Sequence, residues 1–265
     1  MLNLYFSIIL SKNYVHEHNF NIFTIMAHEE QYMIIAISHQ KGGVGKSTLA
    51  YNLSVELNKE YKIKVVDLDV QQTVTACNVI RGKFGQEKLD VISFQDKKAF
   101  VEFLNNDDDK NIIIIDTGGF DSGMNRVAMY AADLIITPVS TEFLEVIGLE
   151  KYKKIIKEVS IKVGKDIKTH VLLNKIHHSQ QNFEDIKNFI NKSSGQFVLM
   201  DSVIRRRSDF SISLSHGFSV CEFDERSDSS KEMKKLIAEV SEILDLENEA
   251  KKIKGKKKNG KKKKS

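Results

Sequence analysis

Residues 33–48 read MIIAISHQKGGVGKST, and this stretch decides the fold. Its first part, residues 33–38, is a short apolar run without a charge, which predicts a buried strand. The glycines that follow accept backbone angles closed to other residues, so successive N–H groups can turn inward onto an anion. A helix that begins at the end of this loop adds its positive dipole end. The stretch therefore predicts a strand, a phosphate-binding loop and a helix.

Two side chains in this loop suit a nucleoside triphosphate and its metal. The Lys46 ammonium can lie between the β- and γ-phosphates, and the Ser47 hydroxyl can bind Mg²⁺. A strict P-loop requires glycine at position 40, where this chain has Gln40, and Lys41 adds a second lysine at the front of the loop. With ATP and Mg²⁺ as the expected cofactors, the predicted nucleotide-binding residues are Gly42, Gly43, Val44, Gly45, Lys46, Ser47 and Thr48.

Carboxylates end two further strands that the sequence predicts. Asp67 and Asp69 lie at the end of the strand 62–67, in VVDLDVQQ, and their i, i+2 spacing points both side chains the same way. Asp116 ends the apolar run IIIID, as in a Walker B strand, which brings its carboxylate to the metal. We expect all three beside the γ-phosphate and Mg²⁺, with loop capping as the alternative for the first two.

The motif KGGVGKST resembles the deviant Walker A motif of the ParA/MinD ATPases, and Lys41 matches the signature lysine of that family. The resemblance implies an ATP-sandwich dimer in which Lys41 reaches the phosphates held by the partner subunit. It also implies that Asp69 positions the attacking water, so the expected catalytic residues are Lys41, Lys46 and Asp69. The metal site implied by the resemblance comprises Ser47, Asp67 and Asp116.

Three further positions are interpreted through the same resemblance. Val70 stands where the family's D-x-D-P-Q motif has proline, which would have fixed φ in that turn. Gly118 and Gly119 stand where relatives often have two prolines, and they fit a loop that moves with the γ-phosphate. Asn174 ends a predicted strand where relatives place an amide that contacts adenine, so it is either a base contact or an ordinary strand-end asparagine.

Short apolar runs alternate with longer mixed segments, which predicts a mostly parallel twisted sheet of about seven strands with helices on both faces. The resemblance identifies this α/β fold as a P-loop NTPase of the deviant Walker A type. The predicted strands are 33–38, 62–67, 90–94, 112–116, 134–138, 169–174 and 198–204. Helices are predicted at 48–59, 97–104, 121–132 and 144–158, followed by a final amphipathic helix. Residues 73–89 look helical at first and then loop-like around Arg81, Gly82 and Gly85.

The order of motifs after residue 198 resembles partition ATPases, especially the small ParF-like group that lacks an N-terminal DNA-reading domain. Basic residues in this part can contact DNA phosphates, although bare solvated arginines are the alternative for residues 205–207. With the tail, the predicted DNA-binding residues are Arg205, Arg206, Arg207, Lys231, Lys234, Lys235, Lys256, Lys257 and Lys258.

The charge of the chain is unevenly distributed. The net charge is +4, but ten of the 40 basic residues are lysines in the last fifteen positions, which contain no acid, so the first 250 residues carry −6. The tail KKIKGKKKNGKKKKS cannot fold alone, and without aromatic residues it offers charge without base reading. We expect a sequence-independent DNA contact, while a solubilising role or binding to RNA or anionic lipid stays open.

Three parts follow from these patterns: an N-terminal extension at 1–32, a ParA-like ATPase domain at 33–250 and a Lys-rich disordered tail at 251–265. The extension is expected to be disordered or a start-site artefact, with Met1, Met26 or Met33 as the start. Its apolar run is too short for a membrane span. The two cysteines are too few for a disulfide framework and suit a reducing cytosol.

The resemblance implies a partition ATPase whose ATP-bound homodimer binds nucleoid DNA nonspecifically in the cytoplasm. A centromere-binding partner, ParB-like or of the small ribbon-helix-helix type, would stimulate weak hydrolysis. A MinD-like membrane switch is the alternative, but the tail has no apolar residue after Ile253. An iron–sulfur enzyme related to the nitrogenase iron protein is disfavoured, because this chain lacks the cysteine expected as a cluster ligand. The paired aspartates argue against a non-hydrolysing scaffold.

Overall fold

The computed structural model describes residues 33–245 except 107–111, 142 and 194. The predictions for the extension 1–32 and for the tail 251–265, which includes Lys256, Lys257 and Lys258, lie outside the described residues. Within the described part the chain forms one seven-stranded sheet in which every paired strand is parallel. The predicted α/β fold with about seven strands is confirmed.

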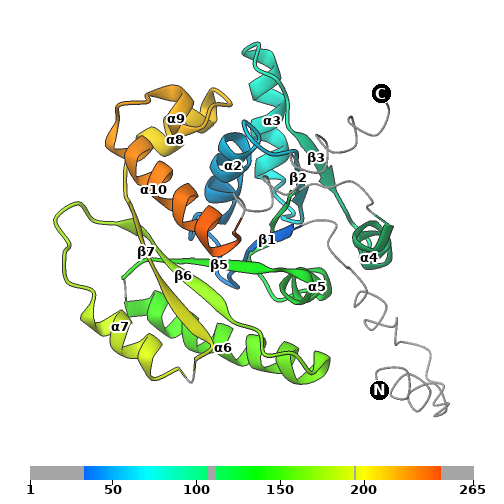
Figure 1. Ribbon diagram of the computed structural model, residues 1–265, viewed down its shortest axis with the longest axis vertical. Coiled ribbons are helices and arrows are strands. Elements are labelled where there is room, and N and C mark those ends of the chain that lie inside the picture. Colours follow the sequence, from blue (N-terminus) through cyan, green and yellow to red (C-terminus); the bar gives the residue numbers. More distant parts are fainter. Residues whose placement is uncertain (1–32, 107–111, 142, 194, 246–265) are drawn as a thin grey trace, which may run out of the picture.

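The strands run in the order β3-β2-β4-β1-β5-β6-β7 across the sheet (Figure 1). Parallel strands are buried on both faces and therefore need continuous apolar sequence. The strand IIIID satisfies this requirement, because all five of its residues are buried. The bounds are β1 (Met33–Ile37), β2 (Ile63–Asp67), β3 (Asp90–Ser93), β4 (Ile112–Asp116), β5 (Leu134–Val139), β6 (Thr169–Ile176) and β7 (Phe197–Arg205).

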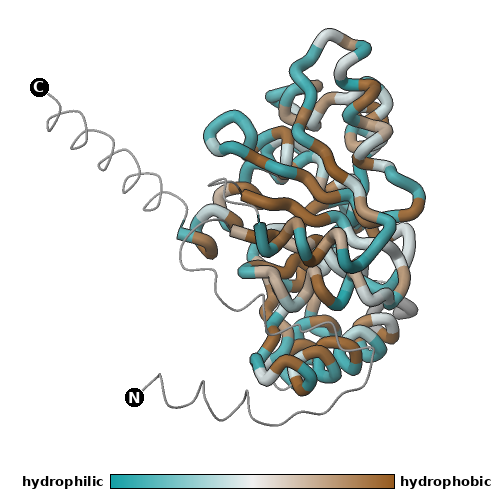
Figure 2. The backbone as a smooth tube through the Cα atoms, turned by 90° about the vertical axis from the view of Figure 1, so that its right-hand side faces the viewer, coloured by the Kyte–Doolittle hydropathy of each residue, from teal (hydrophilic) through white to brown (hydrophobic). Residues whose placement is uncertain are grey.

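Helices cover both faces of the sheet, and hydrophobic strands fill the interior between them (Figures 1 and 2). One apolar cluster joins the sheet to α2 (Lys46–Leu57), α3 (Thr73–Lys83), α8 (Asp209–Ser215), α9 (Val220–Phe223) and α10 (Asp228–Ile243). The other joins it to α4 (Lys97–Asn106), α5 (Gly123–Ala131), α6 (Phe143–Val163) and α7 (Glu184–Asn191).

Helix α7 is the main element that the sequence pattern did not predict. It buries only Ile186 and Ile190, while its remaining residues are mostly polar and exposed, so its apolar period is too short to stand out. Two other predicted bounds are wrong by a few residues. Helix α2 begins at Lys46 instead of residue 48, and α6 continues to Val163.

Strand β7 is an edge strand, and α10 lies against it. The Glu239 carboxylate accepts hydrogen bonds from the main-chain N–H groups of Asp201 (2.7 Å) and Ser202 (2.9 Å). Two turns earlier on the helix, Glu232 accepts from the N–H of Arg205 at 2.9 Å. Side chains of α10 therefore satisfy backbone donors that an edge strand otherwise presents to solvent.

Candidate functional site

The loop between β1 and α2 has the conformation of an anion cradle. Gly43 and Gly45 adopt left-handed φ angles of 77° and 97°, and Gly45 is the N-cap of α2 without a side-chain hydrogen bond. The first N–H groups of α2 therefore have no side-chain cap and point out of the helix end. A helix end of this kind can bind phosphate, so the backbone of residues 42–48 has a geometry that suits phosphate binding.

Strand β6 braces the back of this loop. The Asn174 amide donates to the Val44 carbonyl at 2.7 Å, and the Lys175 ammonium donates to the Gly43 carbonyl at 2.6 Å. A Cβ on Gly45 would lie 2.5 Å from the Asn174 amide nitrogen, so glycine permits this close approach. Asn174 is buried against the loop, a contact that its sequence position did not reveal, and its predicted contact with adenine stays a prediction.

The front of the loop is held by residues that the motif pattern passes over. The Gln40 amide, at the position where a strict P-loop has glycine, donates to the Gly148 carbonyl of α6 at 3.0 Å. His39 accepts a hydrogen bond from the Lys41 main-chain N–H at 2.9 Å, and its ring stacks on Tyr152 with centroids 5.4 Å apart. Gln40, which replaces the glycine of a strict P-loop, therefore anchors the loop to α6.

Lys46 points into the cradle. Its side chain is buried, and its ammonium donates to the Lys41 carbonyl at 3.1 Å. Burial lowers the pKa of Lys46 below its ordinary value, while the charges of Asp116 and Asp69 act in the opposite direction. The two lysines of the loop are thus joined through the backbone, with Lys46 inside the loop and the half-buried Lys41 at its front.

Asp116 lies at the end of β4, between the ends of β1 and β2, where it pairs in register with Ile37 and Asp67. It is fully buried, and neither carboxylate oxygen has a hydrogen-bond partner of good geometry among the described residues. Burial raises the pKa of Asp116 to about 8, although the nearby Ser47 hydroxyl and Lys46 ammonium oppose this shift. A buried carboxylate without partners is costly unless a cation or proton satisfies it.

Asp67 and Asp69 organise the turn after β2. Buried Asp67 accepts from the Thr75 N–H and hydroxyl, both at 2.9 Å, and from the Asp69 N–H at 3.2 Å. The Asp69 carboxylate accepts from the Gln71 N–H at 2.9 Å, which fixes a turn through a side chain. This hydrogen bond holds the turn at Val70.

The loop after β4 lies against the front of the phosphate-binding loop. A Cβ on Gly119 would come within 3.1 Å of the Gly42 Cα and 3.2 Å of its nitrogen. A side chain at position 119 would therefore require the two loops to shift by a few tenths of an ångström. The movement of the loop of Gly118 and Gly119 with the γ-phosphate stays a prediction, but its contact with the phosphate-binding loop is present.

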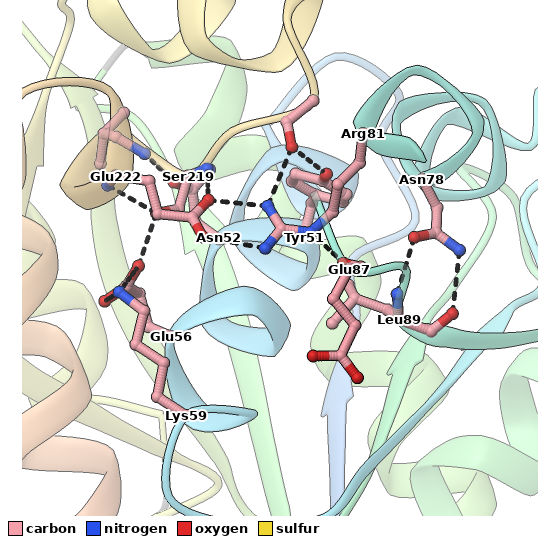
Figure 3. Close-up of polar contacts among 12 residues, drawn as sticks. Tyr51, Asn52, Glu56, Lys59, Asn78, Arg81, Glu87, Leu89, Ser219 and Glu222 are labelled. Atoms are coloured by element: carbon pink, nitrogen blue, oxygen red, sulfur yellow. Dashed lines mark hydrogen bonds and ion pairs between the residues drawn. The ribbon is translucent and has the colours of Figure 1, made fainter. Parts of the chain in front are cut away.

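A buried polar network joins the helices that leave these loops (Figure 3). Arg81 of α3 forms two hydrogen bonds with Glu222, at 2.7 and 2.8 Å, and a third with the Gly217 carbonyl at 3.1 Å. Tyr51 of α2 donates to the same carbonyl at 2.7 Å. Gly217 adopts φ 70°, and a Cβ there would lie 2.3 Å from the Arg81 backbone nitrogen. The segment around Gly217 therefore fixes α2 and α3 relative to each other.

Most of the predicted DNA-binding residues within the described part of the chain form ion pairs or hydrogen bonds with neighbouring groups. The Arg205 guanidinium donates to main-chain carbonyls of the loop 177–180, and Arg207 pairs with Glu232 at 2.8 Å. Arg206 is the exposed member of the three. On α10, Lys231 pairs with Asp228 and Lys234 with Glu225, both at 3.0 Å, and Lys235 donates to the Asp201 carbonyl. Their DNA binding stays a prediction.

Comparison with known families accounts for this arrangement. Residues 35–220 match the family described as the CobQ/CobB/MinD/ParA nucleotide binding domain. The chain belongs to this family. Its MinD/ParA-type fold also recurs in solved structures. Cyanothece McdA without ligand gives a TM-score of 0.63 at 15% identity, covering 81% of this chain and 100% of that one.

Two further structures share the MinD/ParA-type fold. The Pyrococcus furiosus cell division ATPase MinD gives a TM-score of 0.62 at 18% identity, over 80% of this chain and 99% of MinD. A Borrelia burgdorferi B31 protein assigned to plasmid partition and bound to AMPPNP gives 0.60 at 20% identity, over 82% and 100%. Identities this low establish the common fold alone.

Two sequence relatives match shorter segments. An uncharacterized protein of Borreliella burgdorferi is 37% identical over 81 residues, which cover 31% of this chain and 32% of the relative. An uncharacterized protein of Methanocaldococcus jannaschii is 46% identical over 59 residues, or 22% and 21% of the two chains. The chain therefore spans about a third or less of the length of these relatives.

The residues present fit a nucleotide with Mg²⁺. The described residues contain no cluster of three or more His, Cys, Asp or Glu able to hold a metal. Asp116 and the Ser47 hydroxyl are oxygen ligands beside the cradle, and Mg²⁺ usually combines one or two such ligands with phosphates and water.

Among the described helices, none is long and apolar enough to cross a membrane.

Proposed function

We propose that this chain is a ParA-type ATPase for plasmid or chromosome partitioning, with its ATPase domain at residues 33–250. The observation that supports this proposal best is the pair of lysines in one loop. Lys46 is buried and bonded to the Lys41 carbonyl, while Lys41 is half-buried at the front of the loop. One lysine can thus serve the subunit's own nucleotide and the other that of a partner.

The proposed reaction is hydrolysis of ATP to ADP and phosphate. Mg²⁺, when bound, neutralises the phosphate charge that develops during hydrolysis. The first N–H groups of α2 and the Lys46 ammonium hold the phosphates, and Asp116 and Ser47 lie where they can bind the metal. Asp67 accepts hydrogen bonds from Thr75, which fix the turn, and it supports the metal shell beside Asp116. Asp69 orients the attacking water with the carboxylate oxygen that the turn leaves open.

The proposed cycle links hydrolysis to DNA. The ATP-bound homodimer binds DNA without sequence preference, through exposed basic residues and the lysines of 251–265, and a centromere-binding partner stimulates weak hydrolysis. Because phosphate contacts release counterions, engaging roughly six to ten phosphates would lower DNA affinity about 10³- to 10⁵-fold between 50 and 200 mM salt. The proposed location is the cytoplasm, on the nucleoid.

Measurement of molecular mass with ADP, ATP and a slowly hydrolysed analogue tests the proposal. We expect a monomer with ADP and a dimer with the analogue, and only the dimer should bind duplex DNA. Lys41→Gln should bind nucleotide without dimerising, whereas Lys46→Ala should lose nucleotide binding. A chain that stays monomeric with every nucleotide would contradict the proposal, and dimers that bind anionic vesicles instead of DNA would favour a MinD-like role.

A further inference from the structure

A groove of about 600 Å³ lies between α2 and α10, at the end of α2 opposite to the nucleotide loop. The two helices pack side by side on one face of the sheet (Figure 1). Leu57, Tyr61 and Ile237 form its apolar part, and the groove is not used by the proposed ATPase site. It is therefore a separate surface whose occupant has to be identified by its chemistry.

The rim of this groove is acidic. Four acidic residues and one basic residue line it, and Glu60, Glu242 and Asp245 are exposed. Lys234 is bound to Glu225, and Glu56 is engaged by Ser219 at 2.5 Å and Lys59 at 2.8 Å (Figure 3). The negative charge at the rim is therefore carried mainly by the exposed residues Glu60 and Glu242.

An apolar floor with a carboxylate rim suits lysine side chains. A lysine can lay its hydrocarbon stem along an apolar surface while its ammonium remains at the polar edge. The half-buried Tyr61 adds an aromatic ring, over which an ammonium is attracted. A polyanion such as DNA is repelled by the same rim, so the groove fits a cationic peptide.

This chain itself carries such a peptide a few residues after Asp245 in the sequence. The lysines begin at residue 251, and Asp245 lines the groove, so five residues, 246–250, separate the two. Five residues reach at most about 17 Å. Asp245 adopts a left-handed φ of 51°, which ends α10 and turns the chain out of the helix direction.

We propose that the lysine-rich segment 251–258 docks in the groove between α2 and α10 of its own chain. The lysine ammonium groups face Glu60 and Glu242, and Ile253, the one apolar residue among 251–265, packs on the apolar floor. A short connection gives the segment a high effective concentration at the groove, on the millimolar scale. The docked segment is withheld from polyanions until one of them competes for its lysines.

Zero-length carbodiimide crosslinking of the full chain tests the docking itself. This reagent joins a lysine amine to a carboxylate that it contacts, and we expect crosslinks from residues 251–258 to Glu60 and Glu242 at low salt. They should disappear in roughly 0.5 M salt, where the Debye length falls to a few ångströms. Exposed Glu102 and Glu150, on the opposite helical layer, are the matched reference carboxylates.

Equal crosslinking to the reference carboxylates would overturn the proposal, because it would mean that the segment samples all acids alike. Crosslinks that join isotopically light and heavy copies in a mixed sample would also overturn it, since they would place the segment on a second copy. Both results are independent of ATP hydrolysis and of DNA binding, so they separate this inference from the proposed function.

The consequence for DNA, which rests on the proposed function, is tested with neutralised groove residues. Glu60→Gln with Glu242→Gln should raise the affinity for duplex DNA roughly 3- to 10-fold, a gain expected from releasing two exposed ion pairs. Glu102→Gln with Glu150→Gln makes the same charge change elsewhere and should give a smaller gain in affinity for duplex DNA. A gain that persists after deletion of 251–265 would contradict competition by the docked segment.

Discussion

Replacement of Asp116 by asparagine should change how the stability of the nucleotide-free chain depends on pH. The folded-state pKa of Asp116 is raised to about 8, whereas an aspartate in an unfolded chain has a pKa of about 3.9. The folded chain therefore holds this proton more tightly than the unfolded chain. Its stabilising effect is fully present below pH 4, declines as the pH rises and is lost above pH 8.

The magnitude follows from the span between the two pKa values. Each pH unit within that span costs the wild type at most ~1.4 kcal/mol, so between pH 5 and pH 8 its free energy of unfolding should fall by up to ~4 kcal/mol relative to the variant. A buried amide without partners costs about 1–3 kcal/mol at every pH. The free energy of unfolding of Asp116→Asn should thus rise steadily relative to that of the wild type as the pH rises.

Urea unfolding at pH 5, 6, 7 and 8, without nucleotide and with a chelator, measures this difference. Asp185→Asn is the control, because Asp185 is exposed at the start of α7 and its replacement should shift all four values alike. If the wild type and Asp116→Asn keep a constant difference from pH 5 to pH 8, Asp116 is ionised throughout that range. The reasoning from its burial would then be wrong.

Three further changes test other parts of the site. Asp69→Ala should bind ATP but release phosphate at least about tenfold more slowly, since a positioned proton-accepting group contributes about 10²–10⁴-fold, and unchanged turnover would refute its role. Asn174→Ala removes the hydrogen bond to Val44 and should weaken ATP binding about fivefold by calorimetry, a loss of ~1 kcal/mol; equal affinity would show that the brace is unnecessary. Gly217→Ala should destabilise the chain by about 3–5 kcal/mol in urea, from a left-handed φ, a backbone clash and two weakened hydrogen bonds. Gly85→Ala has a similar φ of 76° with open space around it and should cost only about 1–2 kcal/mol, so equal losses would exclude the clash.

The sheet and its motifs could be predicted because their signals are local. The run IIIID predicts a buried strand from composition alone, and its terminal Asp116 then has to lie at the edge where parallel strands end. Asp69 follows the end of β2 by two residues, so it has to lie near the same edge of the sheet. The bounds of these elements differ from the structure by a residue or two, since helix and strand ends depend on capping contacts.

What could not be predicted depends on contacts between residues far apart in the sequence. Asn174 reaches Val44 across 130 positions, and its amide gives no local sign of whether it binds a base or a backbone carbonyl. The same applies to Arg207, whose partner Glu232 lies on another element. A run of three arginines predicts positive charge, but only the fold decides which guanidinium groups remain exposed.

The contacts of α10 with strand β7 restrict how copies of this chain can associate. Glu232 and Glu239 already occupy main-chain donors along that margin of the sheet, and β3 at the opposite margin has only four residues. A β-strand from another molecule would find few partners at either side, so continuous intermolecular sheets are disfavoured. Assemblies larger than two would have to join through helices or loops, and their repeat would follow those surfaces.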